Sequence, residues 1–292
     1  MRFRVLTTLF VLGVSMMAAG QSNAQDGMNL GAGQTLKFVQ DTATGFGNSS
    51  GTQASLGGSE INAVWGDVVG STLSFSVSGN LESNFNKFFL FFDAVAGGEN
   101  VLLSDNNDGG FNEINNLAGL TFDNGFTADY GLRLEVGSGF WALNGFNLNN
   151  NTAFTVASGG GPGDLPLNNV GSSGVFFGWD NSNALGIDGA SAAGALTATT
   201  GWEFSIDLNT YLGAITQDIK LAGFITSGDG TFLSNQVIGG LGAGAPNLAG
   251  PAGTNFNQFA GNQFVVFSVP EPGTASVLLG GLVMMLARRR RS

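Results

Sequence analysis

The segment SDNNDGGFNE, from Ser104 to Glu113, concentrates oxygen-bearing side chains beside two glycines. Carboxylate and amide oxygens are the ligands that Ca²⁺ prefers in proteins, and glycines let a loop curve around the ion. Upstream of this loop, the carboxylate of Asp93 ends the phenylalanine-rich segment FLFFD, 89–93. We therefore predict a site for calcium as a cofactor. Its ligands would be Asp93, Asp105, Asn107, Asp108 and Glu113.

This loop does not follow the EF-hand pattern, in which ligands occupy fixed positions of the segment. With Asp105 at the first position, Gly109 occupies the fifth, and Asn116 occupies the last, where an EF-hand has glutamate. The calcium hypothesis is therefore a sandwich-type site, in which Asp93 acts together with the loop. The alternative is a solvated hairpin loop without metal.

The chain contains neither histidine nor cysteine, which excludes Ser-His-Asp and Cys-His catalysis and sites with thiolate or imidazole ligands. Carboxylates are the main acid–base groups left. Glu203 and Asp207 share one face of a predicted strand, but four residues at about 3.3 Å each separate them by roughly 13 Å. Glycoside hydrolysis needs about 5 to 9.5 Å. We predict that the protein is not an enzyme. A glycan-active hydrolase with carboxylates from different strands is an alternative.

Trp141 and Trp179 are candidate ligand contacts, because tryptophan rings can stack on sugars. Trp179 follows Phe176 and Phe177 at the end of a predicted strand, and Trp141 stands beside the asparagine-rich segment NGFNLNNN. Both positions are compatible with a carbohydrate-binding protein that engages exopolysaccharide. Packing in the core is the competing interpretation for both rings.

Glycine and phenylalanine stand out in the composition, with 48 and 25 residues, respectively. Together with many asparagines and serines, they are typical of a turn-rich all-β protein with an aromatic core. The segment STLSFSVSGN places Leu73, Phe75 and Val77 on one face of a strand and serines on the other. The segment NKFFLFFDA, 86–94, is apolar on both faces, which predicts a strand in the middle of a sheet that is packed on each side.

Further segments with strand patterns bring the prediction to roughly ten strands, which fits a single large antiparallel β-sandwich, jelly-roll-like, over residues 25–268. The segment DLNTYLG, 207–213, predicts one short helical turn. Two segments, FLFFDAVAGG and GWEFSIDLNTYLG, resemble the family 9 carbohydrate-binding modules and DOMON-like sandwiches. This resemblance implies the same kind of sandwich fold.

The N-terminal segment has the features of a secretory signal peptide. Arg2 and Arg4 precede an apolar stretch, 5–19, and Ser22-Asn23-Ala24 forms a small-residue cleavage site. We predict that residues 1–24 are removed by cleavage between Ala24 and Gln25. An uncleaved transmembrane anchor is the alternative.

The C-terminal segment, 269–292, has the features of a membrane stop. Pro270-Glu271-Pro272 precedes an apolar stretch, 273–287, which would span roughly 22 Å as a helix. This length falls short of the ~30 Å hydrocarbon core, but the arginines 288–291 can snorkel, and the positive-inside rule keeps them cytoplasmic. A buried C-terminal helix with a solvated basic end is the alternative.

An export signal paired with this tail resembles the PEP-CTERM sorting signal. The resemblance implies export in Gram-negative bacteria, transient anchoring in the inner membrane by the apolar helix, and processing by an exosortase, a membrane transpeptidase. The protein would then reach the cell surface or the extracellular space. The sorting motif comprises Pro270, Glu271, Pro272, Arg288, Arg289, Arg290 and Arg291.

The body between the two signals is strongly acidic. Residues 25–270 contain four basic and twenty acidic residues, a formal charge of −16. Such a surface repels nucleic acid and anionic lipid, so nucleic-acid binding is excluded. We predict an exported structural or adhesive component of the cell surface or biofilm matrix, with carbohydrate binding and glycan hydrolysis as the alternatives.

Overall fold

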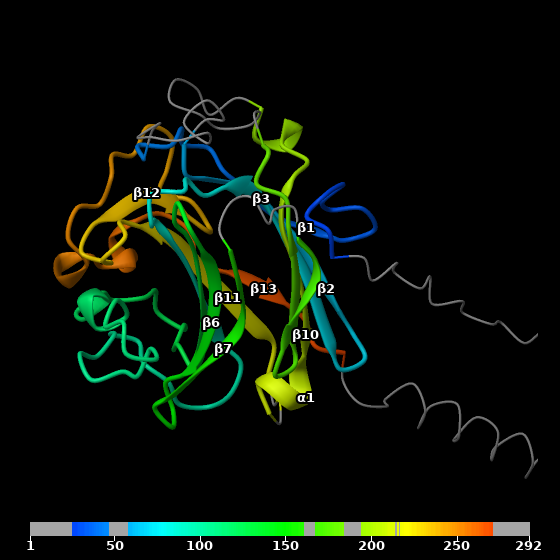
Figure 1. Ribbon diagram of the computed structural model, residues 1–292. Helices are drawn as coiled ribbons and strands as arrows, with labels where there is room; N and C mark the ends of the chain where they lie inside the picture. Colours follow the sequence, from blue (N-terminus) through cyan, green and yellow to red (C-terminus); the bar gives the residue numbers. More distant parts are fainter. Residues whose placement is uncertain are drawn as a thin grey trace, which may run out of the picture.

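The computed structural model of this chain describes residues 25–46, 58–160, 167–183, 194–213, 215 and 217–270. In these residues the strands form two antiparallel sheets that lie face to face (Figure 1). The prediction of an all-β protein is therefore confirmed. The predicted signal peptide, 1–24, and the predicted apolar helix, 273–287, lie outside the described residues.

The six-stranded sheet has the order β1-β2-β3-β10-β9-β8. All of its neighbouring strands run antiparallel, with β3 and β10 in the middle. In sheet order, the strands comprise Leu36–Val39, Glu60–Val69, Thr72–Asn80, Gly201–Asp207, Val175–Trp179 and Leu167–Ser172.

The seven-stranded sheet has the order β12-β11-β4-β5-β6-β7, and β13 also pairs with β11. The pairing of β4 with β5 has no register shift and runs from Lys87 opposite Glu135 to Phe92 opposite Tyr130. In sheet order, the strands comprise Leu233–Val237, Ile219–Thr226, Lys87–Asp93, Tyr130–Val136, Trp141–Asn147 and Thr152–Gly159, with β13 at Val265–Phe267.

The helices of the described residues are short. Helix α1, Leu208–Tyr211, follows β10 directly, which confirms the helical turn predicted from DLNTYLG. Asp207 caps this helix, because its carboxylate accepts a hydrogen bond from the backbone N–H of Thr210 at 3.1 Å. The 3-10 helices are η2 at Asn115–Leu117, η4 at Ala195–Thr197, η5 at Pro251–Gly253 and η6 at Phe256–Gln258.

The two sheets enclose an apolar cluster, here called the inter-sheet core. In β3, Leu73, Phe75 and Val77 point into it, as their alternation with serines predicts. Phe75 stacks on Phe204 of β10 with the ring centroids 4.7 Å apart. Removing such large rings from water is the main favourable contribution to folding, so this cluster holds the two sheets together.

Strand β4 is buried along its whole length. Phe88 and Phe92 face the inter-sheet core, whereas Phe89 and Phe91 face the other way, into a second apolar cluster that we call the outer core. Successive side chains of a strand point to opposite faces, so a strand that is apolar on both faces needs cover on both. The prediction of a central strand packed on each side is therefore confirmed.

Two covering segments, 94–129 and 241–264, lie on the outer side of the seven-stranded sheet, where Figure 1 shows them in teal-green and orange. They are bonded to each other. The N–H of Thr121 donates to the carbonyl of Thr254 at 2.9 Å, and the N–H of Phe256 donates to the carbonyl of Thr121 at 2.9 Å. The molecule thus has a third layer, which consists of loops and 3-10 helices.

Phe91 lies at the centre of the outer core, with ring centroids 5.2 to 5.7 Å from those of Phe122, Phe146 and Phe224. We expect Phe91→Ala to lower the free energy of unfolding by about 3 to 5 kcal/mol, because the third layer cannot close around the cavity completely. Denaturant unfolding measures this change. Phe176→Ala is the matched control, since that ring is 41% exposed on the edge-proximal strand β9. Equal losses of unfolding free energy in Phe91→Ala and Phe176→Ala would show that the third layer is not packed as described.

Candidate functional site: a buried ion network

Strand β5 carries two charged residues between its apolar ones. Leu132 and Leu134 point into the inter-sheet core, so Arg133 and Glu135 point to the outer face of the sheet. Lys87 at the start of β4 stands directly opposite Glu135 in the register. All three charged side chains lie under the covering segment 94–129 and are almost completely buried.

The covering segment supplies two carboxylates to these charges. Arg133 Nη1 contacts Glu113 Oε2 and lies 3.5 Å from Asp108 Oδ2, and its Nη2 lies 3.8 Å from Glu135 Oε1. Lys87 Nζ contacts Glu135 Oε2 and lies 3.6 Å from Glu113 Oε1. We call these five residues the ion network. Two cations thus hold three carboxylates, and the five residues come from three segments of the chain, β4, β5 and the covering segment 94–129.

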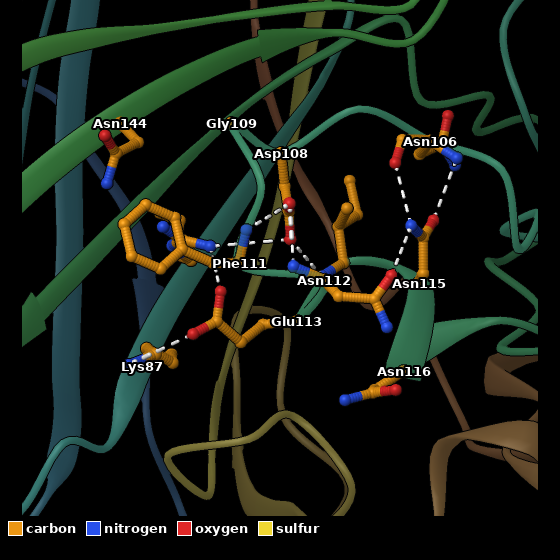
Figure 2. Close-up of polar contacts among 12 residues, drawn as sticks. Lys87, Asn106, Asp108, Gly109, Phe111, Asn112, Glu113, Asn115, Asn116 and Asn144 are labelled. Carbon is orange, nitrogen blue, oxygen red and sulfur yellow. Dashed lines mark hydrogen bonds and ion pairs between the residues drawn. The ribbon is translucent and has the colours of Figure 1, made fainter.

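Asp108 also organises the loop to which it belongs. Its Oδ1 accepts hydrogen bonds from the backbone N–H groups of Phe111 at 3.0 Å and Asn112 at 2.8 Å, and its Oδ2 accepts one from Ile114 at 3.1 Å (Figure 2). Asn112 takes a positive φ of 67°, a conformation that asparagine tolerates better than most residues. The carboxylate therefore acts as the internal support of the turn that follows it.

Amide side chains attach the rest of the loop to its surroundings. The side chain of Asn115 bonds the backbone of Asn106: its Oδ1 accepts from the N–H at 2.8 Å, and its Nδ2 donates to the carbonyl at 2.9 Å (Figure 2). Asn116 Nδ2 donates to the carbonyl of Asp229 at 2.8 Å. Asn151 Nδ2 donates to the carbonyl of Asp105 at 2.9 Å. In this structure, the side chains of these asparagines hold the loop to neighbouring segments by hydrogen bonds.

Phe111 covers the ion network from the solvent side. Its ring centroid lies 4.8 Å from the guanidinium carbon of Arg133, although the Phe111 side chain is 59% exposed. A guanidinium over an aromatic face gains electrostatic attraction, and the ring excludes water from one side of the cation. Phe111 thus shields Arg133 and leaves its own outer face in water.

Burial raises the pKa of the Glu113 carboxyl, and the neighbouring carboxylates of Glu135 and Asp108 add to this effect. The positive charges of Arg133 and Lys87 act in the opposite direction, but they do not cancel the cost of desolvation. Glu113 therefore binds its proton more tightly in the folded than in the unfolded protein.

The structure brings two of the predicted calcium ligands, Asp108 and Glu113, together on Arg133, but it places Asp93 apart from them. Asp93 ends β4 at the opposite end from Lys87, where its Oδ2 accepts from Lys220 Nζ at 2.8 Å and its Oδ1 accepts from Gln217 Nε2 at 2.6 Å. Asp108 and Glu113 are bound to Arg133, as described above. Asn107 Oδ1 accepts from the N–H of Gly109. Within the described ranges, no group of three or more acidic residues is arranged to hold a metal ion.

Both candidate tryptophans lie in the inter-sheet core. Trp179 is 0% exposed and lies 6.3 Å, between centroids, from Trp202 of the neighbouring strand. Trp141 is 3% exposed and meets Phe177 in a T-shaped contact at 5.8 Å. Each ring points inward because it shares a face with apolar neighbours of its own strand. Neither ring presents a face to solvent on which a sugar could stack.

The residues of the predicted processing sites fall at the borders of the described chain. Gln25 is described and 8% exposed, whereas Ala24 lies outside the described residues. Pro270 is described and exposed, whereas Glu271, Pro272 and the arginines 288–291 lie outside. In the part of the chain that the structure describes, no helix has the length and apolar character needed to span a bilayer.

Sequence reasoning missed Lys87, Arg133 and Glu135 as members of a site. The signal was present in the segment ADYGLRLEV, where alternation places Arg133 and Glu135 on one face opposite Leu132 and Leu134. That pattern alone is typical of a solvated outer face. Only the third layer, which sequence periodicity does not reveal, buries these charges.

Compared with models of protein families, with curated proteins and with solved structures, the chain matches none.

Glu113→Gln tests how the ion network responds to pH. Folding raises the pKa of Glu113, so protonation of this carboxyl stabilises the folded state. This contribution to the free energy of unfolding is fully present below the unfolded pKa and is lost as the pH rises through the folded pKa. We therefore expect the stability of the wild type, relative to Glu113→Gln, to increase as the pH falls from about 7 to about 4. Urea unfolding at several pH values measures this difference.

Asp229→Asn is the control, because the pKa of Asp229 is shifted in the opposite direction to that of Glu113. Hydrogen bonds from Ser227 and Thr231 lower the pKa of Asp229, so its contribution is present above the unfolded pKa and is lost as the pH falls. The stability of the wild type relative to this variant should therefore decrease over the same range. Slopes of the same sign for both variants would contradict the account of Glu113.

The calcium hypothesis has a direct test in the melting temperature. A ligand that binds only the folded state raises the melting temperature by mass action. Since Asp93 is bound to Lys220, and Asp108 and Glu113 are bound to Arg133, we expect the same melting temperature in excess calcium and in chelator. A calcium-dependent rise that Asp93→Asn removes would overturn this expectation.

Proposed function

We propose that this chain is an exported protein, sorted by a PEP-CTERM pathway, with a non-enzymatic structural or adhesive role at the cell surface or in the extracellular matrix. The observation that carries the proposal is the pairing of a signal-peptide-like segment, 1–24, with Pro-Glu-Pro, an apolar stretch and four arginines in 269–292. The first and last described strands, Leu36–Val39 and Val265–Phe267, both lie between the two predicted processing points. Cleavage at both points would leave every described strand intact.

Hydrogen bonds hold residues 25–27 to the six-stranded sheet, and a cut after Ala24 would preserve them. The carbonyl of Gln25 accepts a hydrogen bond from the N–H of Asn169 in β8 at 2.7 Å. Glu203 Oε2 accepts from the N–H groups of Asp26 and Gly27 at 3.0 and 3.1 Å. These bonds hold residues 25–27 on the outer face of the six-stranded sheet, which supports Gln25 as the start of the mature protein.

Near the predicted C-terminal processing point, hydrogen bonds hold the chain as far as Val269. Asp218 accepts hydrogen bonds from the hydroxyl of Ser268 at 3.4 Å and from the N–H of Val269 at 3.0 Å. Pro270, the next residue, is exposed. A transpeptidase acting at this motif would reach a backbone that the fold does not bury, which supports exosortase as the processing partner.

The non-enzymatic part of the proposal rests on how the carboxylates of the ion network are bound. Asp108 accepts three backbone N–H groups, and all three network carboxylates contact a cation. Groups bound in this way position a loop and are poorly placed to exchange protons with a substrate. The proposal also includes a jelly-roll-like connectivity, which is supported by the passage of the chain between the sheets after β3, β7 and β10.

Two tail variants separate anchoring from processing. Replacing Arg288 to Arg291 with serine should weaken membrane retention, because the apolar stretch 273–287 is too short to anchor well without its flanking charge. Replacing Pro270-Glu271-Pro272 with alanines should instead make the uncut precursor accumulate in the inner membrane. Fractionation and intact-mass measurement check both results.

The contrary outcome is equally specific. A basic C-terminal helix packed on the body predicts that both variants are released whole. A wild-type protein that is fully soluble and still ends at Ser292 would defeat the sorting proposal.

A further inference from the structure

Residues 248–259 of the covering segment curl around a surface cavity of about 400 Å³, which we call the cup. This volume lies within the range of about 300 to 1,000 Å³ that is typical of ligand pockets. Helices η5 and η6 form its wall, and Leu248 and Phe259, both in its lining, pack against the outer core. The cup is thus the outer surface of the third layer.

The cup is fastened to the rest of the molecule at both ends. The N–H of Leu233 in β12 donates to the carbonyl of Ala249 at 2.7 Å, and the N–H of Leu248 donates to the carbonyl of Leu233 at 3.1 Å. At the far end, Thr254 and Phe256 bond to Thr121, as described above. A loop held at both ends is largely preformed, so a ligand would not have to order it.

The polar groups of the cup are amides and a hydroxyl. Asn255 Oδ1 accepts from the N–H and Nδ2 of Asn257 at 3.0 and 2.8 Å, which orients the side chain and leaves its own Nδ2 as a donor. Thr254 Oγ1 donates to the carbonyl of Gly250 at 3.1 Å and retains its lone pairs. Gln258 is exposed, and among the described contacts its side-chain amide makes no hydrogen bond, whereas its backbone N–H donates to the carbonyl of Asn255.

This lining selects a ligand by its chemistry. All side chains in the lining are uncharged, so an ionic ligand would find no counter-charge there. A purely apolar ligand would leave the amides of Asn255 and Gln258 unpaired, which costs free energy. A neutral sugar satisfies both conditions, because its hydroxyls pair with amides while its C–H face packs on the partly exposed ring of Phe259.

We propose that the cup binds one unit of a neutral saccharide. The inference deepens the adhesive role proposed above and rests on it for its biological setting, since a matrix protein meets polysaccharide. It relocates the expected sugar contact from the buried tryptophans to the covering segment 241–264.

Gly250 provides a variant that fills the cup without straining the backbone. Its φ of −78° and ψ of 140° are open to any L-residue, and an added Cβ would meet no atom within 4 Å. Gly250→Leu should therefore fold and occupy the space with its side chain. Gly139→Leu, in the turn between β5 and β6, is the matched control outside the cup lining, because an added Cβ there also meets no atom within 4 Å.

The experiment measures binding of the purified full chain to defined neutral oligosaccharides of glucose, mannose and galactose by calorimetry, with an oligouronate as the charged comparison. We expect binding to at least one neutral probe, roughly tenfold weaker binding in Gln258→Ala through the lost amide contacts, and loss of measurable binding in Gly250→Leu. Gly139→Leu should bind like the wild type. Melting temperatures of the variants verify that each is folded.

Each contrary result overturns the inference. The first such result is that no neutral probe binds. The second is that the oligouronate binds more strongly than the neutral probes, and the third is that Gly250→Leu and Gln258→Ala both bind with wild-type affinity. A protein that is sorted and processed but binds no neutral sugar contradicts the cup alone. A protein that binds sugar but remains an unprocessed soluble chain contradicts the sorting proposal alone, so the two failures are distinguishable.

Discussion

Strand β4 is apolar on both faces, and the number of layers in the molecule depends on this property. The six-stranded sheet can cover only one of these faces. Leaving Phe89 and Phe91 in water would forfeit roughly 1.5 to 3 kcal/mol for each ring, so the second face also needs an apolar cover. The covering segments 94–129 and 241–264 meet that need, and the long connections after β4 and β12 follow from it.

The same covering segments determine whether the charged residues of β4 and β5 are buried. Lys87, Arg133 and Glu135 point outward and would be solvated in a molecule of two layers. The third layer removes their water, which costs several kcal/mol per ion, and it offsets that cost by supplying Asp108 and Glu113. A buried ion pair adds little net stability, but a displaced partner is expensive. The network therefore favours one position of the covering segment over shifted ones.

The third layer also gives the protein two different outer sides. On the outer face of the six-stranded sheet, Glu203 holds the backbone of residues 25–27. On the opposite side, the lining of the cup includes the amides of Asn255 and Gln258 and the ring of Phe259. The proposed start of the mature chain and the proposed ligand site thus lie on opposite sides of the molecule. This arrangement is compatible with the adhesive role proposed above, because contacts at one side leave the other accessible.

Local features of this protein were predictable from its sequence alone. The faces of β3 and β10, the two-sided burial of β4 and the helical turn α1 all follow from side-chain periodicity, which is a property of the backbone. What each polar group faces was decided by the tertiary structure. Asp93 meets Lys220, which lies 127 positions further along the chain, and Glu113 meets Arg133 across a layer boundary. An oxygen-rich loop has the same sequence pattern whether its partner is calcium or a guanidinium, and only the order of the strands determines which cation is within reach.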